Sequence, residues 1–351
     1  MIPFAFVIHP LKPQDVARKY PIARFAPDWL IEQLMRKKKP VVAGNVTGIK
    51  SITGQELHGW LIACPLTPKL MMENVELAYE RIVTCTEMAN ELGAKIIGLG
   101  AFTSVVGDGG VTVASRSKIA VTTGNSYTVA TAIEGTLRAC ELIGVIPKNS
   151  TLAVVGATGS IGKTCARVLG RDFGRTIVVG RDLAKTEAIA HEIGPGVLAS
   201  TDMKSILEAD AIITVTSSDA PVIMPEHLRP GAVVCDVARP RDVSVRVSKE
   251  RPDVLVIEGG VVSVPGDVEF GINFGFPPKT AYACMSETMM LALEGRAESF
   301  TLGKDVSVEQ VDETQRMAAK HGFKLAGFRS FEKAVTEEAI ERARKARQGI
   351  L

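Results

Sequence analysis

Short apolar runs separated by polar or glycine-rich segments divide the chain into three parts. In the first part, compact apolar or alternating runs between turn residues predict strands. Longer stretches with apolar residues every three or four positions predict helices, and a glycine follows two of them, as is common at helix ends. The expected strands are 2–8, 41–50, 56–64 and 95–99, with helices at 13–20, 27–38, 67–92 and 126–143.

The pattern changes after Pro147, where short buried strands alternate with helices. This alternation is typical of βαβ units and a parallel sheet. Strands are expected at 152–155, 176–179, 211–215, 232–235 and 254–257, with one helix ending near Phe173 and another at 183–193. The predicted fold class is α/β, with a Rossmann-type parallel-sheet domain at 146–262 and an N-terminal α/β substrate domain at 1–145.

The last part, residues 263–351, begins with SVPGDVEFGINFGFPP, a segment rich in glycine, proline and phenylalanine that predicts an ordered loop. Helical patterns follow at 279–293, 307–320 and 331–347. We expect these C-terminal helices to return to the N-terminal domain. The result would be a two-lobed protein with a cleft between the lobes.

Composition narrows the class of protein. The chain has 351 residues, 46% apolar and 23% charged, as expected for folded domains. A formal net charge of +2 gives no general affinity for polyanions, so nucleic acid is not expected as a partner. No run of ~20 apolar residues and no export signal is found, which predicts a cytoplasmic protein without a transmembrane segment. A mean hydropathy of +0.17 leaves open a homo-oligomer interface, an apolar tunnel or a peripheral membrane contact.

The six cysteines and five histidines are scattered along the chain. Neither a CxxC nor an HExxH pattern occurs, so we predict neither a disulfide framework nor a metal site. Taken singly, each cysteine is most simply a small buried apolar side chain.

The most informative segment is TLAVVGATGSIGKTCARVLG, which reads as a strand, a glycine turn and a helix in direct succession. In this context Gly156 allows a sharp turn, Gly159 lets the backbone approach a pyrophosphate, and Gly162 lets the helix pack closely. The helix N-terminus offers free N–H groups to phosphates. The predicted dinucleotide-binding residues here are Gly156, Ala157, Thr158, Gly159, Ser160, Ile161 and Gly162.

The end of the second strand of this domain bears on the choice of cofactor. An acidic residue near this point binds the ribose of NAD, but here Arg181 comes first and Asp182 follows. Arginine can hold a 2′-phosphate in a forked geometry, which favours NADPH. The alternative is that Arg181 is solvated and Asp182 turns inward. Thr216 and Ser217 follow a later strand and could contact the cofactor or form a plain turn.

Cys284 is the one cysteine next to a predicted helix start, marked by Pro277 and Pro278. A helix N-terminus favours thiolate and therefore lowers the pKa of a thiol. We expect this effect at Cys284. From the residues alone, a nucleophilic and a purely structural role both remain open.

Six stretches, in this order, resemble the aldehyde-forming long-chain acyl-[acyl-carrier-protein] reductases best known from cyanobacteria. They cover most of residues 1–325. The matching stretches are TGQELHGWLIAC (53–64), LGAFTSVV (99–106), TTGNSYTVA (122–130), VVGATGSIG (154–162), EGGVV (258–262) and YACMSETMMLALEG (282–295).

The resemblance implies an NADPH-dependent reduction of a fatty acyl thioester to a free aldehyde, with Cys284 as the nucleophile. The substrate would be carried on acyl-carrier protein or coenzyme A. Donors for the oxyanion are expected in 100–104 or 122–126, where small polar residues follow core elements. The stretch 263–281 and the C-terminal charged helix depart from the family pattern. We expect that helix to lie on the surface or to serve oligomerisation.

Because acyl-carrier proteins are acidic, a reductase of this family should carry a basic docking patch. Arg36 to Lys39 are a candidate for this patch, or simply a solvated helix end.

Other classes of protein also remain open. The nucleotide domain also resembles the shikimate dehydrogenase and glutamyl-tRNA reductase group. A dehydrogenase of that kind would need a Lys–Asp pair, for which Lys50, Lys118 and Asp108 could be proposed. A glutamyl-tRNA reductase would use a cysteine of the first domain, such as Cys64. The last alternative is an NADP(H)-binding protein without turnover.

Overall fold

The computed structural model describes residues 1–18, 21–272 and 277–350, which form two compact units. Unit 1 comprises Met1–Gly124, Ser263–Lys304 and Glu313–Lys324. Unit 2 comprises Asn125–Val262, Asp305–Asp312 and Leu325–Leu351. This division differs from the predicted boundaries, because each unit is completed by segments from the C-terminal part of the chain.

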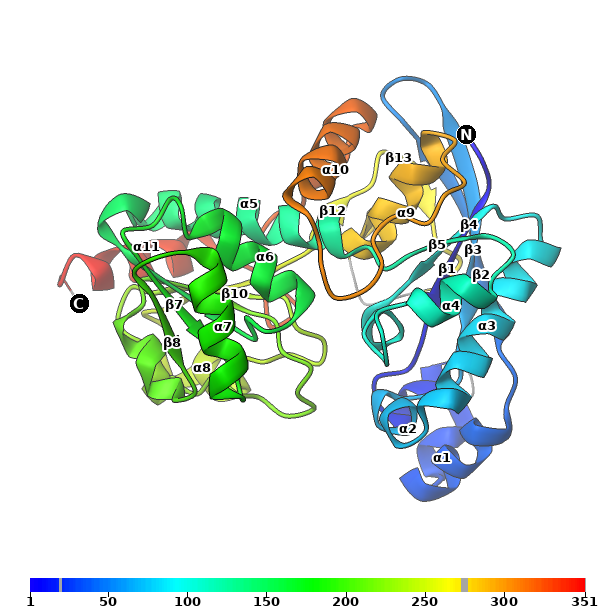
Figure 1. Ribbon diagram of the computed structural model, residues 1–351, viewed down its shortest axis with the longest axis horizontal. Helices are drawn as coiled ribbons and strands as arrows, with labels where there is room; N and C mark the ends of the chain where they lie inside the picture. Colours follow the sequence, from blue (N-terminus) through cyan, green and yellow to red (C-terminus); the bar gives the residue numbers. More distant parts are fainter. Residues whose placement is uncertain (19–20, 273–276, 351) are drawn as a thin grey trace. The chain divides into compact units, whose positions relative to one another are not determined.

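Unit 1 is built on a six-stranded sheet with the order β13-β2-β3-β1-β4-β5 (Figure 1). Strands β3, β1, β4 and β5 are parallel, whereas β2 and β13 run antiparallel to their neighbours. The strands are β1 (Phe4–Ile8), β2 (Val41–Lys50), β3 (Glu56–Ala63), β4 (Ile96–Leu99), β5 (Ala120–Thr122) and β13 (Gly266–Glu269). The predicted hairpin is present as β2 and β3, and β13 extends it at the edge of the sheet.

The helices of unit 1 cover both faces of this sheet. On one face, Ala5 and Val7 of β1 pack with residues of α3 such as Ile82. Phe6 points the other way, because side chains alternate along a strand, and lies with Gly98 next to Thr288 of α9. The helices are α1 (Asp28–Lys37), α2 (Pro68–Glu73), α3 (Val75–Glu91), α4 (Val111–Arg116) and α9 (Ala283–Leu293), with 3₁₀ turns η1 (Pro13–Arg18), η2 (Pro21–Phe25) and η3 (Ala101–Ser104).

Unit 2 contains a six-stranded parallel sheet with the order β11-β10-β9-β6-β7-β8. Numbered from the first strand of the unit, this is the doubly wound order 3-2-1-4-5-6 of a dinucleotide-binding fold. The predicted α/β class with a Rossmann-type sheet is therefore confirmed. Its strands are β6 (Thr151–Val155), β7 (Arg175–Val179), β8 (Val197–Ser200), β9 (Ala211–Thr214), β10 (Val233–Asp236) and β11 (Leu255–Glu258).

Helices and short hairpin strands complete unit 2. Helix α5 packs against β10 and α6, which places 125–145 in this unit and not in the N-terminal domain as predicted. The helices are α5 (Asn125–Ile143), α6 (Ser160–Leu169), α7 (Leu183–Ile193), α8 (Val245–Glu250) and α11 (Glu337–Arg347), with η4 (Pro147–Asn149), η5 (Met203–Glu208), η6 (Pro225–His227) and strands β16 (Arg329–Ser330) and β17 (Lys333–Ala334). Helix α10 (Val308–His321), β12 (Val261–Ser263) and β15 (Lys324–Leu325) span unit boundaries.

Four predicted elements differ in the structure. The charged helix expected at 331–347 begins only at Glu337, and Lys333–Ala334 within that stretch form β17. The helix expected over 67–92 is broken at Asn74, whose side chain accepts the Leu77 N–H and starts α3. The loop expected at 263–278 contains the edge strand β13, while 273–276 lie outside the described residues. The helix expected from Lys279 begins only at Ala283. Lys279 has a left-handed backbone, and 280–282 form the extended strand β14 (Thr280–Tyr282).

The high apolar content of the chain fills the two cores. The longest helices, α3 and α5, have 17 and 19 residues, and both carry charged side chains. Within residues 1–18, 21–272 and 277–350, no helix combines the length and the apolar character needed to cross a membrane.

The C-terminal helix α11 packs on α5 inside unit 2. Ile340 and Ala343 are buried, and the Arg344 guanidinium donates to the Leu142 carbonyl through Nε at 3.0 Å and Nη2 at 2.8 Å. Leu142 lies in the last turn of α5, where carbonyl groups lack helical partners and a cation is favourable. The helix is therefore integral to unit 2, and not a freely solvated surface helix.

We expect Arg344→Ala to lower the free energy of unfolding by about 1–2 kcal/mol, because two charge-assisted hydrogen bonds to a helix end are lost. Chemical denaturation measures the change. Arg342→Ala, an exposed position on the same helix, is the matched control and should change stability by less than about 0.5 kcal/mol. Equal effects of the two substitutions would contradict a specific role for the Arg344 contact.

Candidate functional site

The glycine turn of unit 2 connects β6 to α6 at the carboxyl edge of the sheet. Gly156 has φ +84°, and a Cβ there would lie 2.5 Å from the Val215 carbonyl oxygen. A Cβ on Gly162 would lie 2.4 Å from the Gly156 carbonyl oxygen. By contrast, a Cβ on Gly159 would have only the Gly156 oxygen near it, at 3.4 Å. The protein itself therefore requires glycine at 156 and 162, whereas the space at 159 stays open to a ligand.

The end of β7 separates the roles of Arg181 and Asp182. The Asp182 side chain accepts the Lys185 N–H at 3.1 Å and caps α7. This cap, first among the causes, lowers the pKa of Asp182. Arg181 is exposed. Asp182 therefore caps α7, and Arg181 is the exposed charged side chain at the end of β7.

Thr216 follows β9 and is held by a buried carboxylate. Its hydroxyl lies 2.5 Å from Asp242 Oδ1, and its N–H donates to Asp242 Oδ2 at 2.8 Å. Thr214 donates to the same oxygen at 2.6 Å. Ser217 is exposed. Because the Thr216 hydroxyl is engaged with Asp242, a ligand at this loop would meet backbone groups and the Ser217 hydroxyl.

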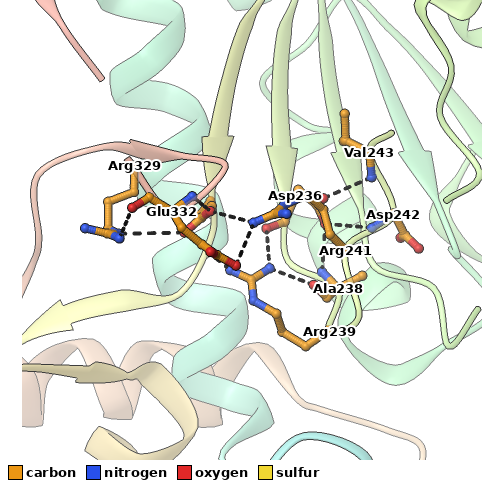
Figure 2. Close-up of polar contacts among 9 residues, drawn as sticks. Asp236, Ala238, Arg239, Arg241, Asp242, Val243, Arg329 and Glu332 are labelled. Atoms are coloured by element: carbon orange, nitrogen blue, oxygen red, sulfur yellow. Dashed lines mark hydrogen bonds and ion pairs between the residues drawn. The ribbon is translucent and has the colours of Figure 1, made fainter. Parts of the chain in front are cut away.

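Asp236 anchors the segment that carries Asp242, as Figure 2 shows. It accepts the N–H groups of Ala238 at 3.1 Å and Val243 at 3.0 Å. Burial raises the pKa of Asp236 to about 6, although Arg239 and these hydrogen bonds act in the opposite direction. The polar groups at the ends of β9 and β10 thus form one connected brace.

A second group of polar contacts surrounds Glu258 at the end of β11, and Figure 2 shows three of its members, Arg241, Arg329 and Glu332. Glu258 accepts from Arg241 at 3.0 Å and from the Glu332 N–H at 2.7 Å. Arg241 also lies over the Phe331 ring, 4.9 Å from its centroid. These contacts fasten the β16–β17 hairpin to the sheet, so we assign the cluster a structural role.

Cys284 lies in unit 1 at the second residue of α9, with Tyr282 as the N-cap. Its side chain is only partly buried, unlike those of the other five cysteines. Gly124 packs directly on it, and a Cβ at Gly124 would lie 2.2 Å from the Cys284 Cα. Any side chain at position 124 would therefore displace the N-terminus of α9.

Burial raises the pKa of Cys284 to about 12. The backbone N–H groups of Met285 and Ala101 act in the opposite direction by hydrogen bonding toward the sulfur. The expectation of a lowered pKa is therefore wrong for the free protein. The helix N-terminus does stabilise the thiolate, but desolvation outweighs that stabilisation.

The loop that presents Ala101 to Cys284 is held by a histidine. Ala101 has φ +48°, an uncommon conformation for a residue with a Cβ. The next N–H, of Phe102, donates to His9 Nε2 at 3.0 Å, while His9 Nδ1 lies 3.0 Å from the Pro10 carbonyl. Burial lowers the pKa of His9 to about 4, so the ring is neutral at neutral pH and can accept from Phe102. His9 thereby fixes the Ala101 N–H close to the sulfur.

A buried glutamate, Glu287, connects helix α9 to the residues around Thr122 and Thr301. Glu287, one turn beyond Cys284, is fully buried and accepts from Thr122 Oγ1 at 2.5 Å and Thr301 Oγ1 at 2.9 Å. The Gly124 N–H in turn lies 3.4 Å from Thr122 Oγ1. The structure therefore brings both predicted oxyanion loops, 100–104 through Ala101 and 122–126 through Gly124, to Cys284.

The alternative catalytic residues are not assembled into a site. Lys50 pairs with Glu56 at 3.0 Å, and Asp108 accepts from the Thr112 hydroxyl at 2.6 Å. Lys118 is exposed, and Cys64 is fully buried in the core that packs on α3.

His9, Glu287 and Asp242 were missed by sequence reasoning. His9 does carry a local signal, since this polar residue directly follows the predicted strand 2–8, whereas Asp242 lies seven residues beyond the strand predicted at 232–235. Glu287 carries none, because it lies in an apolar helix where a charged residue is read as solvent-facing.

Comparisons with known proteins address the reaction class. A family model described as shikimate / quinate 5-dehydrogenase matches residues 143–258. The chain is 30% identical to the aminotransferase PigE of Serratia sp. over 88% of its own length, but it spans only 37% of that protein. It is 26% identical to the long-chain acyl-[acyl-carrier-protein] reductase of Synechococcus elongatus, covering 88% of this chain and 94% of the reductase.

A solved glutamyl-tRNA reductase from Methanopyrus kandleri is also similar, at 20% identity and a TM-score of 0.33, over 54% of this chain and 48% of that one. The family match and the reductase likeness support an oxidoreductase with a nicotinamide-dinucleotide-binding unit.

We expect Gly159→Ala to weaken NADPH binding about tenfold or more without lowering thermal stability, because the added methyl meets little protein but blocks close approach of a pyrophosphate. Fluorescence titration and thermal denaturation test the two parts. Gly162→Ala is the contrasting variant and should lower the melting temperature, since its Cβ has no room. Unchanged NADPH affinity in Gly159→Ala would show that no pyrophosphate lies against this turn.

Proposed function

We propose that this protein reduces a fatty acyl thioester to a fatty aldehyde with NADPH, through an acyl-enzyme on Cys284. The observation that carries the proposal is the setting of Cys284, a partly accessible thiol at a helix N-terminus with the Ala101 and Met285 N–H groups directed at its sulfur. The likeness to an acyl-[acyl-carrier-protein] reductase over 94% of that protein's length supports this choice of substrate class.

In the first step, the Cys284 sulfur attacks the thioester carbonyl and the carrier thiol leaves. The Cys284 proton ends on the departing sulfur, so one thioester is exchanged for another and no net proton is released. Because the raised pKa keeps the free thiol protonated, the proton must leave Cys284 as its sulfur attacks, and the departing carrier sulfur is its final acceptor. Backbone N–H groups at the sulfur are suitably located to stabilise charge on the carbonyl oxygen.

In the second step, the acyl-enzyme is reduced. When bound, NADPH supplies the hydride that adds to the acyl carbonyl carbon. The resulting hemithioacetal collapses as the carbonyl re-forms, and aldehyde leaves while the Cys284 sulfur takes up a proton. The residues of unit 2 fit the cofactor, because the open space at Gly159 admits a pyrophosphate and Arg181 can meet a 2′-phosphate.

The carrier is an acyl-carrier protein or coenzyme A, and we propose a cytoplasmic setting. A shikimate-type dehydrogenase is a second candidate, favoured by the family match at 143–258. That match covers the nucleotide unit and not Cys284. A lysine–aspartate pair, which such an enzyme would use, is not formed by Lys50 or Asp108, because both have other partners.

We expect Cys284→Ala to lose aldehyde formation by roughly a thousandfold, because the covalent step needs the thiol. The assay follows NADPH oxidation with a panel of acyl-carrier-protein and acyl-CoA thioesters and identifies the aldehyde by mass. Cys64→Ala is the control and should retain activity. Loss of activity in Cys64→Ala alone would favour a glutamyl-tRNA-reductase-like mechanism. NADPH binding without turnover of any thioester would favour a non-catalytic binding protein or a dehydrogenase.

We expect Arg181→Gln to raise the KM for NADPH about tenfold or more and to change the KM for NADH little, because only NADPH carries the 2′-phosphate. Steady-state kinetics with both cofactors measure the ratio. Lys185→Gln, at an exposed position in the first turn of α7, is a nearby charge control. If Arg181→Gln weakens both cofactors equally, Arg181 does not read the 2′-phosphate.

A further inference from the structure

Unit 1 exposes three large apolar side chains within eight residues of each other. Ile22 is 81% exposed, Phe25 is 84% exposed, and Trp29 is 65% exposed. Ile22 and Phe25 are three residues apart in the 3₁₀ turn η2, so they point in the same direction. Single exposed apolar residues are ordinary, but a group of this size marks a contact surface.

Helix α1 shows why these side chains are not part of the core. Its buried residues, Ile31 and Met35, are four apart and form one stripe. Trp29 lies on the opposite side, together with Arg36 and Lys37 at seven and eight residues along. Helix α1 therefore packs one apolar stripe on unit 1 and exposes Trp29 on its opposite, polar face.

The charges around these residues are mainly basic. Lys37, Lys38 and Lys39 are exposed, and no carboxylate in the described parts of the chain pairs with them. The acidic side chains next to α1 are largely engaged: Glu73 pairs with Arg36 at 2.5 Å, and Glu32 with Lys69 at 3.0 Å.

Asp28 accepts a hydrogen bond from Gln14, and Asp15 of η1, which packs against η2, accepts the N–H groups of Leu11 and Lys12; Arg24 on η2 is exposed. The net charge of the surface is positive.

We infer that this surface, formed by Ile22, Arg24, Phe25, Trp29 and Lys37 to Lys39, binds the face of an anionic lipid bilayer. Exposed Trp and Phe in a segment that also carries exposed lysines are the composition of interfacial membrane-binding elements. Lysines attract anionic headgroups without needing a fixed geometry. An acidic protein partner is the alternative occupant, and the experiments below separate it from lipid. The inference goes beyond the proposed function and does not depend on it.

Co-sedimentation with vesicles tests the inference. We expect the full chain to bind vesicles of phosphatidylglycerol and phosphatidylcholine, and to bind much less to vesicles of phosphatidylcholine alone. The variant Phe25→Ser with Trp29→Ser, and a separate variant with Lys37, Lys38 and Lys39 changed to Gln, should each weaken binding by about tenfold or more. Ile146→Ser, which removes another side chain that is 60% exposed, is the matched control and should bind as the parent does.

Tryptophan fluorescence gives a second readout that does not depend on how the serine variants fold. The chain has two tryptophans, and Trp60→Phe leaves Trp29 as the single probe. We expect its emission to move to shorter wavelength, and to be quenched by brominated lipid, when phosphatidylglycerol vesicles are added.

An emission that does not respond to these vesicles would overturn the inference. So would a shift produced by acyl-carrier protein and not by lipid, which would instead assign the surface to the acidic carrier. Neither outcome would bear on thioester reduction, which is measured separately with soluble substrates.

Discussion

The contact between Gly124 and the backbone of Cys284 is the constraint on which the proposed chemistry depends. It is possible only because position 124 has no Cβ and a left-handed φ of +74°. This approach brings the end of β5 onto the first turn of α9, while the loop after β4 reaches the same turn through Ala101. Backbone thus flanks the partly accessible thiol and directs N–H groups at it, while desolvation raises its pKa.

Buried carboxylates perform the same task in both units. In unit 1, Glu287 ties the end of β5 and residue 301 to α9 through two threonine hydroxyls. In unit 2, Asp242 ties the residues after β9 to the segment that follows β10, again through threonines. An ionisable group without partners would be costly in either core, so the hydroxyl contacts are what make these positions tenable. Both braces lie next to a loop to which we assign a functional role, which explains why rigid polar networks occur there.

The pattern of the chain predicted most of the elements and the glycine turn correctly in kind, but it failed where local signals were weak. The helix over 67–92 has good periodicity throughout, and only the side-chain contact from Asn74 to the Leu77 N–H reveals its break. The strand β13 lies in a segment rich in glycine, proline and phenylalanine, which is typical of a loop, and it is extended because the edge of β2 offers it hydrogen-bond partners. The sequence did not predict that α5 belongs to unit 2 either, because an apolar helix face can pack against any sheet.

By itself, the sequence determined the alternation of strands and helices in unit 2, the dinucleotide-type turn at 156–162 and the single cysteine next to a helix start. These features are local, because a turn, a cap or a periodic face is encoded by neighbouring residues. Only the tertiary structure decided what surrounds Cys284, since His9, Ala101 and Gly124 come from segments far from it in the chain. The same holds for the protonation of the thiol, because a pKa depends on desolvation and on the groups that folding brings near, not on sequence position.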